Sequence, residues 1–242
     1  MTQAELYTLA PVWLLGAMAL WSFVPFYRRC LRPWIKGHQG EKRVCDLLRL
    51  YEFEILHGLY VPNAAGELAQ VDIVVKLQNS IAVIEVKNLQ GQIDGTDYDQ
   101  NWVQIIDNKS WKIPNYYVQN QRQIRHVKHI LPNVHVWGNV VFVGNVQTPH
   151  MSAPNVKTLE NFRRYIAEYK TKYQLHEHSP EIDAAWLTLV DQAKHKTWEQ
   201  RRDHRKLLRS WFGWDKRRVL ITARFAMLSV GAVLAGVYAW GF

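Results

Sequence analysis

The sequence contains little cysteine, with only Cys30 and Cys45 among 242 residues. Two cysteines do not make the disulfide framework of a small secreted domain, so nothing in the chain requires an oxidising compartment. Zinc patterns are missing too, because the closely spaced histidines have neither a cysteine pair nor a third ligand beside them. Internal repeats and low-complexity linkers are also absent, so we expect one ordinary domain between the two ends of the chain.

Acidic residues are outnumbered, with 21 Asp and Glu against 30 Lys and Arg and a formal net charge of +9. The excess is uneven: residues 194–218 hold ten basic and three acidic residues, which is +7, so the rest carries only +2. Attraction to anionic lipid at a membrane surface accounts for such a cluster. The net charge is therefore no argument by itself for nucleic-acid binding.

Charge is missing altogether from residues 6–27 and nearly so from 219–242, where Arg224 is the one charged residue. Each run is long enough to cross a bilayer, which takes about 20 residues. A secretory signal peptide is the alternative for the first run, but Glu5 rather than a basic residue precedes it. Basic clusters follow the first run and precede the second, so the positive-inside rule predicts that residues 28–218 are cytoplasmic and that both termini lie on the opposite side.

The centre of the chain contains two β-branched runs within residues 70–87, separated by a polar break at 78–80. This pattern predicts a β-hairpin. If the first two residues of the break form a two-residue turn, Asp72 lies opposite Glu85, and strand alternation puts Lys87 on the same face. Apolar strands seldom bury charges unless the charges are paired or bind a metal, so this hairpin is the candidate functional element.

Helical periodicity predicts a first helix over residues 38–51, with Glu41 on its apolar face. A first-turn acid is also what the helix dipole favours, and the pattern fits either role. Arg122 and Arg125 share one side of another predicted helix, either as a phosphate-facing stripe or as a solvated face. The other expected elements are strands at 53–61, 102–106 and 134–143 and helices at 115–131, 158–172 and 182–212.

These elements predict an α/β domain, a mixed sheet flanked by helices, over residues 36–150. A helical, basic juxtamembrane region is expected over 155–218. One transmembrane helix at 6–27 and another at 219–242 complete the predicted organisation.

Several of these residues together resemble the nuclease-related domain, NERD, over roughly residues 36–145. The residues that carry the resemblance are Gly40-Glu41, Gln70-Val71-Asp72, Ile84-Glu85-Val86-Lys87-Asn88, Gly91-Gln92-Ile93, Trp102, Asn115, Gln119 and Asn120. Tyr116 stands where the family has a proline. NERD belongs to the PD-(D/E)xK superfamily, so the resemblance implies a restriction-endonuclease-like fold.

The roles that the resemblance implies agree with the chemistry of the residues. Asp72 and Glu85 supply the hard oxygen ligands that suit Mg²⁺ or Mn²⁺, with the backbone carbonyl of Val86 as a further ligand. Lys87 would orient the attacking water or stabilise the developing negative charge. Glu41 would reach a second metal or a metal-bound water.

Substrate positioning falls to Gln119 at the rim of the site, together with Arg122 and Arg125. The alternative for the whole group is an ion-pair cluster of Asp72, Lys87 and Glu85 that binds no metal.

Two functions follow for the chain. The first is a membrane-anchored, Mg²⁺-dependent nuclease that hydrolyses nucleic acid, with DNA as the expected substrate, at the cytoplasmic face. The alternative is a non-catalytic membrane protein whose nuclease-like domain binds nucleic acid or a protein partner. A nuclease-like domain that has lost its catalytic activity should lack at least one of Glu41, Asp72, Glu85 and Lys87. All four are present here, which favours the enzyme. A channel or transporter subunit is disfavoured, because neither apolar run contains an acid or a broken helix.

Overall fold

The structure, a computed structural model, describes residues 3–62, 65, 67–173, 178–195 and 216–240. The chain separates into two compact units. The larger unit is residues 37–208, and the smaller consists of residues 1–36 and 209–242.

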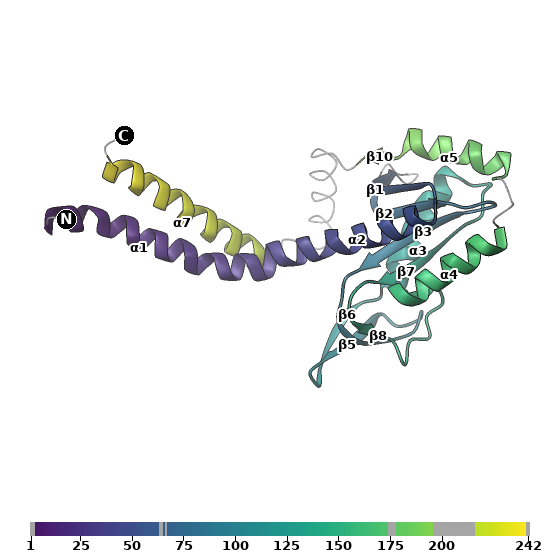
Figure 1. Cartoon of the computed structure of the whole chain (residues 1–242), viewed down its shortest axis with the longest axis horizontal. Helices are drawn as coiled ribbons and strands as arrows, with labels where there is room; N and C mark the ends of the chain where they lie inside the picture. Colours follow the sequence, from purple (N-terminus) through teal and green to yellow (C-terminus); the bar gives the residue numbers. More distant parts are fainter. Residues whose placement is uncertain (1–2, 63–64, 66, 174–177, 196–215, 241–242) are drawn as a thin grey trace. The chain divides into compact units, whose positions relative to one another are not determined.

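The larger unit is built on a six-stranded mixed sheet with the order β10-β1-β2-β3-β7-β9 (Figure 1). Its strands are β1 (Ile55–Pro62), β2 (Leu68–Lys76), β3 (Ile81–Lys87), β7 (Val136–Phe142), β9 (Val156–Thr158) and β10 (Lys194–His195). The central strand β3 pairs antiparallel with β2 and parallel with β7. The prediction of a mixed sheet is confirmed. A strand that is paired on both sides and covered on both faces has a nearly continuous apolar sequence, because side chains on both faces are buried. Strand β3 has such a sequence.

A smaller four-stranded sheet has the order β6-β5-β4-β8. Its strands are β4 (Gly91–Asp94), β5 (Asn101–Ile106), β6 (Lys109–Pro114) and β8 (Val146–Gln147). Between β5 and β6, Asp107 and Asn108 have φ of 48° and 59°, the pair of left-handed residues that a tight two-residue hairpin turn needs. The sequence pattern predicts β5 but not β6, because β6 is exposed at nearly every position and shows no alternation.

Helices cover both faces of the six-stranded sheet. They are α2 (Arg32–Leu50), α3 (Tyr116–Ile130), α4 (Leu159–Tyr173) and α5 (Pro180–Gln192). Ile84 lies in one apolar cluster with side chains of α2 and α4, whereas its neighbour Val83 lies in the other cluster, with side chains of α3 and α5. Successive residues of a strand point to opposite faces, so α2 and α4 cover one face and α3 and α5 the other.

The predicted helix over residues 182–212 is too long. Helix α5 ends at Gln192, Ala193 forms its C-cap, and the chain then enters β10, which pairs antiparallel with β1. The rest of that prediction, residues 196–212, lies outside the described residues. The segment 155–218 is thus not wholly helical in its described part, since it also contains β9 and β10.

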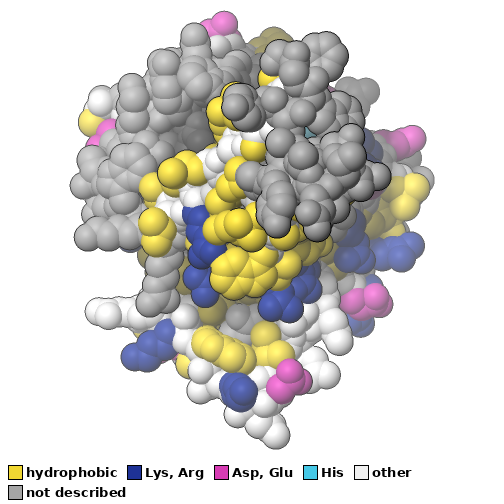
Figure 2. All heavy atoms as spheres, turned by 90° about the vertical axis from the view of Figure 1, so that its left-hand side faces the viewer, with side chains coloured by type: hydrophobic (Ala, Val, Ile, Leu, Met, Phe, Trp, Pro, Cys, Tyr) yellow, Lys and Arg dark blue, Asp and Glu magenta, His cyan; other side chains and the backbone are white. Residues whose placement is uncertain are grey.

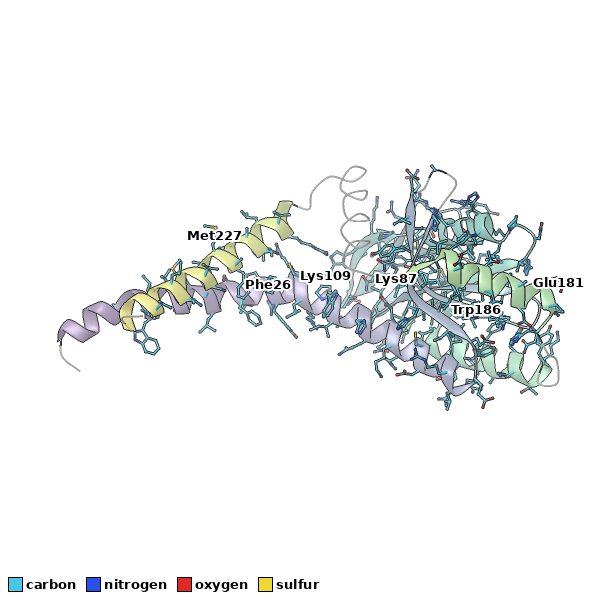
Figure 3. The ribbon with its side chains drawn as sticks, turned by 90° about the horizontal axis from the view of Figure 1, so that it is seen from above. Phe26, Lys87, Lys109, Glu181, Trp186 and Met227 are labelled. Atoms are coloured by element: carbon cyan, nitrogen blue, oxygen red, sulfur yellow. The ribbon has the colours of Figure 1, made fainter. Side chains whose placement is uncertain are left out.

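The smaller unit contains α1 (Gln3–Phe26), a π-helical turn at Tyr27–Leu31, and α7 (Lys216–Trp240). The rings of Phe26 and Phe225 stack with centroids 4.6 Å apart, so α1 packs against α7. Figure 2 faces this helix pair and shows hydrophobic side chains gathered on it. Met227 on α7 projects away from α1 in Figure 3 and is 74% exposed.

Among the described residues, one helix is long and apolar enough to cross a membrane, at Arg218–Val237. This helix lies at the predicted C-terminal span, 219–242. The predicted N-terminal run, 6–27, falls mostly within the long apolar helix α1. That α1 crosses a membrane stays a prediction.

Candidate functional site

The hairpin of β2 and β3 has the predicted register. The N–H of Leu77 donates to the carbonyl of Ser80 at 3.0 Å, which closes a two-residue turn. Pairs then run back to Ile73 opposite Ile84. The next step in the same register sets Asp72 opposite Glu85, as predicted from the turn length.

At that step Asp72 reaches across to the partner strand with its side chain. The N–H of Val86 donates to Asp72 Oδ2 at 3.1 Å, and Gln70 Nε2 lies 3.4 Å from Oδ1. The carboxylate is only 6% exposed. A backbone donor on the neighbouring strand therefore fixes the position of the acid at the end of the hairpin ladder.

Glu85 is 1% exposed, and both of its oxygens have partners. Gln119 Nε2 donates to Oε1 at 2.7 Å, and Gln123 Nε2 donates to Oε2 at 2.5 Å. The Lys87 ammonium, one side-chain step along the same face of β3, forms an ion pair with Oε1. The structure thus brings Asp72, Glu85 and Lys87 together, as predicted. Gln119, which was predicted at the rim of the site, lies against the Glu85 carboxylate.

Gln123 was not among the predicted site residues. It lies four residues after Gln119 on α3, so both amides lie on one side of the helix, and this spacing is the signal in the sequence. Gln123 also donates to the carbonyl of Gln70 at 3.0 Å. It therefore links both strands of the hairpin to α3.

Helix α3 lies close to the sheet because small and polar groups meet beneath it. Asn120 is 1% exposed and its Nδ2 donates to the carbonyl of Val83 at 3.1 Å. Gly138 on β7 leaves the room for this contact, because a Cβ there would lie 2.4 Å from Asn120 Oδ1. Asn115 caps the helix by accepting from the N–H of Val118 at 3.1 Å. The predicted helix start is confirmed, with Tyr116 as the first residue of α3.

The pKa values of two side chains of the site, Glu85 and Lys87, are shifted from their ordinary values. Burial raises the pKa of Glu85, and the negative charge of Asp72 raises it further; Lys87 and Gln123 oppose the shift, and the pKa settles at about 7. Burial alone would lower the pKa of Lys87, but the charges of Glu85 and Asp72 outweigh it and raise this pKa. Two carboxylates lie beside a single ammonium, so the site has an excess of acidic groups that one more cation would offset.

The Lys87 ammonium also contacts an aromatic ring. The ammonium lies over the ring of Tyr116, 4.8 Å from its centroid, which is a cation–π contact. Tyr116 in turn packs edge-on against Trp102, with centroids 5.8 Å apart, and against Phe142. Figure 3 labels Lys87, which comes from the last position of β3. Lys87 is thus held from two sides, by Glu85 and by the ring.

Glu41 lies near the same end of β3. A Cβ on the preceding Gly40 would lie 3.1 Å from Asn88 Cβ, so the first part of α2 comes close to the chain just after Lys87. The buried Cys45 thiol senses both acids: burial raises its pKa to about 11, and the charges of Glu41 and Asp72 contribute to the rise. Glu41 and Asp72 therefore both lie close enough to Cys45 for their charges to act on its thiol.

Arg122 and Arg125 are exposed on α3, away from its buried residues. Both the solvated face and the phosphate-facing stripe remain compatible with that placement.

No group of three or more His, Cys, Asp or Glu side chains within metal-binding reach occurs in the described part of the chain. Of the predicted ligands, Asp72 and Glu85 are two such side chains and Val86 would add a backbone carbonyl. The further candidate, Glu41, does not join the two carboxylates within that reach. Both are hard oxygen donors, and their excess negative charge fits a divalent cation of the Mg²⁺ or Mn²⁺ type.

Residues 36–143 match the family model of the nuclease-related domain, NERD. This chain contains a NERD domain. The match covers the hairpin, α3 and β7, which together hold the carboxylates, the lysine and the amides of the site. The match ends before α4 and α5, although these helices pack on the same sheet.

One relative is an uncharacterised protein of Bacillus anthracis, 29% identical over 102 residues, which are 41% of this chain and 48% of that protein. The chain thus spans about half the length of the curated relative it matches. No solved structure matches the chain.

Proposed function

We propose that this chain is a membrane-anchored nuclease of the PD-(D/E)xK superfamily, whose NERD domain hydrolyses phosphodiester bonds with the help of Mg²⁺ or Mn²⁺. The observation that carries the proposal is the pair of buried carboxylates, Asp72 and Glu85, beside the partly buried Lys87 at the end of the hairpin, with one ammonium for two carboxylates. A nuclease-related domain supports a nuclease-like activity. The matched region contains every residue of this group.

Asp72 and Glu85 would hold the metal ion, with the carbonyl of Val86, and Glu41 would approach from α2. When bound, such an ion neutralises charge on the phosphate and lowers the pKa of a coordinated water. Glu85 with a pKa of about 7 exchanges its proton for the ion most easily at neutral or higher pH.

The protein's own side chains would stabilise the developing negative charge and orient the groups of the site. Lys87 keeps its charge, and its Nζ can donate to a phosphate oxygen on which negative charge develops. Gln119 and Gln123 fix the orientation of the Glu85 carboxylate. The ring of Tyr116 limits the positions that the Lys87 ammonium adopts. These contacts order the site before substrate arrives, which is the condition for effective electrostatic stabilisation.

DNA at the cytoplasmic face is the proposed substrate, and the two apolar helices are the proposed anchors. The apolar C-terminal helix at Arg218–Val237 supports anchoring. The basic clusters that follow the first apolar run and precede the second support a cytoplasmic domain. Anionic lipid would then contact the basic segment next to the second helix.

The test is metal-dependent cleavage by the purified full-length chain in detergent, on single- and double-stranded DNA and RNA. Asp72→Asn should lose both metal binding, measured by calorimetry with Mn²⁺, and cleavage. Lys87→Ala should retain metal binding and lose cleavage, because lysine is not a ligand here. The matched control is Asp46→Asn, an exposed acid of α2 paired with Lys42, which should change neither. Wild-type protein that binds Mn²⁺ no better than Asp72→Asn rules out the proposal.

The second candidate is a non-catalytic binding domain. The observation in its favour is that Gln119, Gln123 and Lys87 already give both Glu85 oxygens hydrogen-bond partners, as in a structural ion-pair cluster. This candidate predicts a different pattern in the same experiment. Asp72→Asn and Lys87→Ala would both lower the unfolding temperature, and neither would change affinity for Mn²⁺.

A further inference from the structure

The β5–β6 hairpin, which we call the arm, is joined at its base to the candidate site. Trp102 on β5 is fully buried and donates from Nε1 to the carbonyl of Thr96 at 2.7 Å. Its ring packs edge-on against Tyr116, the ring that lies under the Lys87 ammonium. In Figure 1 the arm extends to an edge of the domain, away from the six-stranded sheet. The base of the arm is therefore fixed against the residue that supports Lys87.

One face of the arm continues outward from that base. The cross-strand pairs are Trp102 with Ile113, Gln104 with Trp111, and Ile106 with Lys109. Cross-strand partners share a face, as do residues two apart on one strand. Trp111 and Lys109 therefore lie on the same face as Trp102, at successive steps of about 6.6 Å from Ile113.

This face ends in an aromatic side chain and a cation that are open to solvent. Trp111 is 45% exposed, and Lys109 is exposed next to the turn. Figure 3 labels Lys87 and Lys109, and both lie at the end of the domain that is on the left of that view. The opposite face differs, because it carries the pair Val103 and Lys112 and has no aromatic residue.

We propose that this face of the arm binds an unpaired segment of nucleic acid that leads to the Lys87 site, with a base stacked on Trp111 and a phosphate against Lys109. Stacking on aromatic rings beside cations is how proteins bind single strands without regard to sequence. An unpaired base is required because a duplex hides the faces of its bases. Asp107, in the turn, is the one acidic residue in the segment 101–114, so the arm carries net positive charge. The substrate class rests on the nuclease function proposed above.

The experiment measures binding separately from cleavage. Full-length protein in detergent carries Asp72→Asn and is kept in EDTA, and fluorescence anisotropy follows a labelled single strand and the matching duplex. Trp111→Ala should weaken single-strand binding about tenfold, and Trp111→Phe should restore most of it. Lys109→Ala should lower the salt slope of the binding constant by about 0.7, the value of one phosphate contact to a single strand. Lys112→Ala, on the same strand but the opposite face, is the matched control and should change neither quantity.

The proposal is overturned if Trp111→Ala binds the single strand as its parent does, if Lys109→Ala and Lys112→Ala behave alike, or if the duplex loses as much affinity as the single strand. If the wild-type chain cleaves nucleic acid and any of these results is obtained, the nuclease proposal holds and the proposal that the arm binds a single strand fails. If Trp111→Ala binds the single strand more weakly and the wild type does not cleave, the proposal that the arm binds a single strand is supported and the nuclease proposal is refuted.

Discussion

The pKa of Glu85 gives a direct test of how the site is held. Its folded value of about 7 lies above the value of 4.5 that an unperturbed Glu has. Between these two values the unfolded chain is already ionised while the folded chain still binds the proton. The free energy of unfolding should therefore fall as pH rises from about 4.5 to about 7, and should level off above pH 7.

The size of the fall follows from the same shift. One pKa unit corresponds to about 1.4 kcal/mol, so the separation between the folded and unfolded values corresponds to a loss of about 3 kcal/mol in the free energy of unfolding. That amount is a large part of the stability of an ordinary domain, which is about 5–15 kcal/mol. Burial is the main cause, and the charge of Asp72 is the second.

The measurement is urea unfolding of the full chain in detergent, followed by tryptophan fluorescence between pH 4 and 8. Other groups titrate in this range, so the quantity of interest is the difference between wild type and Glu85→Gln. Glu85→Gln shifts the curve by a constant amount but has no proton to lose, so the difference should change by about 3 kcal/mol across the window. Parallel curves for the two proteins would refute the assignment of the raised pKa to Glu85.

Metal addition extends the test at pH 8. An ion that binds only the folded, ionised site should stabilise wild type by about 2.7 kcal/mol at a hundred times its dissociation constant. Glu85→Gln should gain less. A structural ion-pair cluster predicts no gain for either protein.

Two further predictions concern the framework of the site and the topology of the chain. Gly138→Ala places a Cβ 2.5 Å from the carbonyl of Val83 as well as against Asn120, so it should destabilise the fold by about 2–3 kcal/mol or more in urea unfolding and displace α3 from Glu85. Gly37→Ala in α2, where a Cβ meets nothing within 4 Å, should instead stabilise by up to about 1 kcal/mol; equal destabilisation by both changes would contradict the packing argument. Reporter fusions at residue 1 and at residue 242 should both read as non-cytoplasmic, and a cytoplasmic reading at either end would exclude the two-span topology.

The hairpin that holds the two carboxylates was predictable because its causes are local. A two-residue turn fixes the register, and strand alternation then decides which side chains share a face. Asp72, Glu85 and Lys87 could therefore be placed from the sequence alone. The site amides were harder to predict. Gln119 came from a resemblance, and Gln123 was missed because its contact with Glu85 depends on how closely α3 approaches the sheet.

The errors in the fold have tertiary causes. The segment after Gln192 has a composition that suits a helix, but the chain leaves α5 at Ala193 and pairs with β1. Strand β8 consists of two residues, and its partner β4 lies far away in sequence. Neither pairing leaves a periodic pattern to find, since the partner strand is what makes these residues extended.

Tyr116 shows how a departure from a family pattern can carry information. A proline at the first position of a helix pre-sets the backbone there, and Tyr116 is the first residue of α3. Asn115 supplies the helix start in another way, since its side chain caps Val118 while its Nδ2 donates to the carbonyl of Asp99 at 2.7 Å. The position is then free for a ring, and the ring lies under the Lys87 ammonium. Proline could not support the lysine in this manner, because it has no aromatic face. Tyr116 thus couples the orientation of Lys87 to the aromatic packing at the base of β5, which no local pattern in the sequence would show.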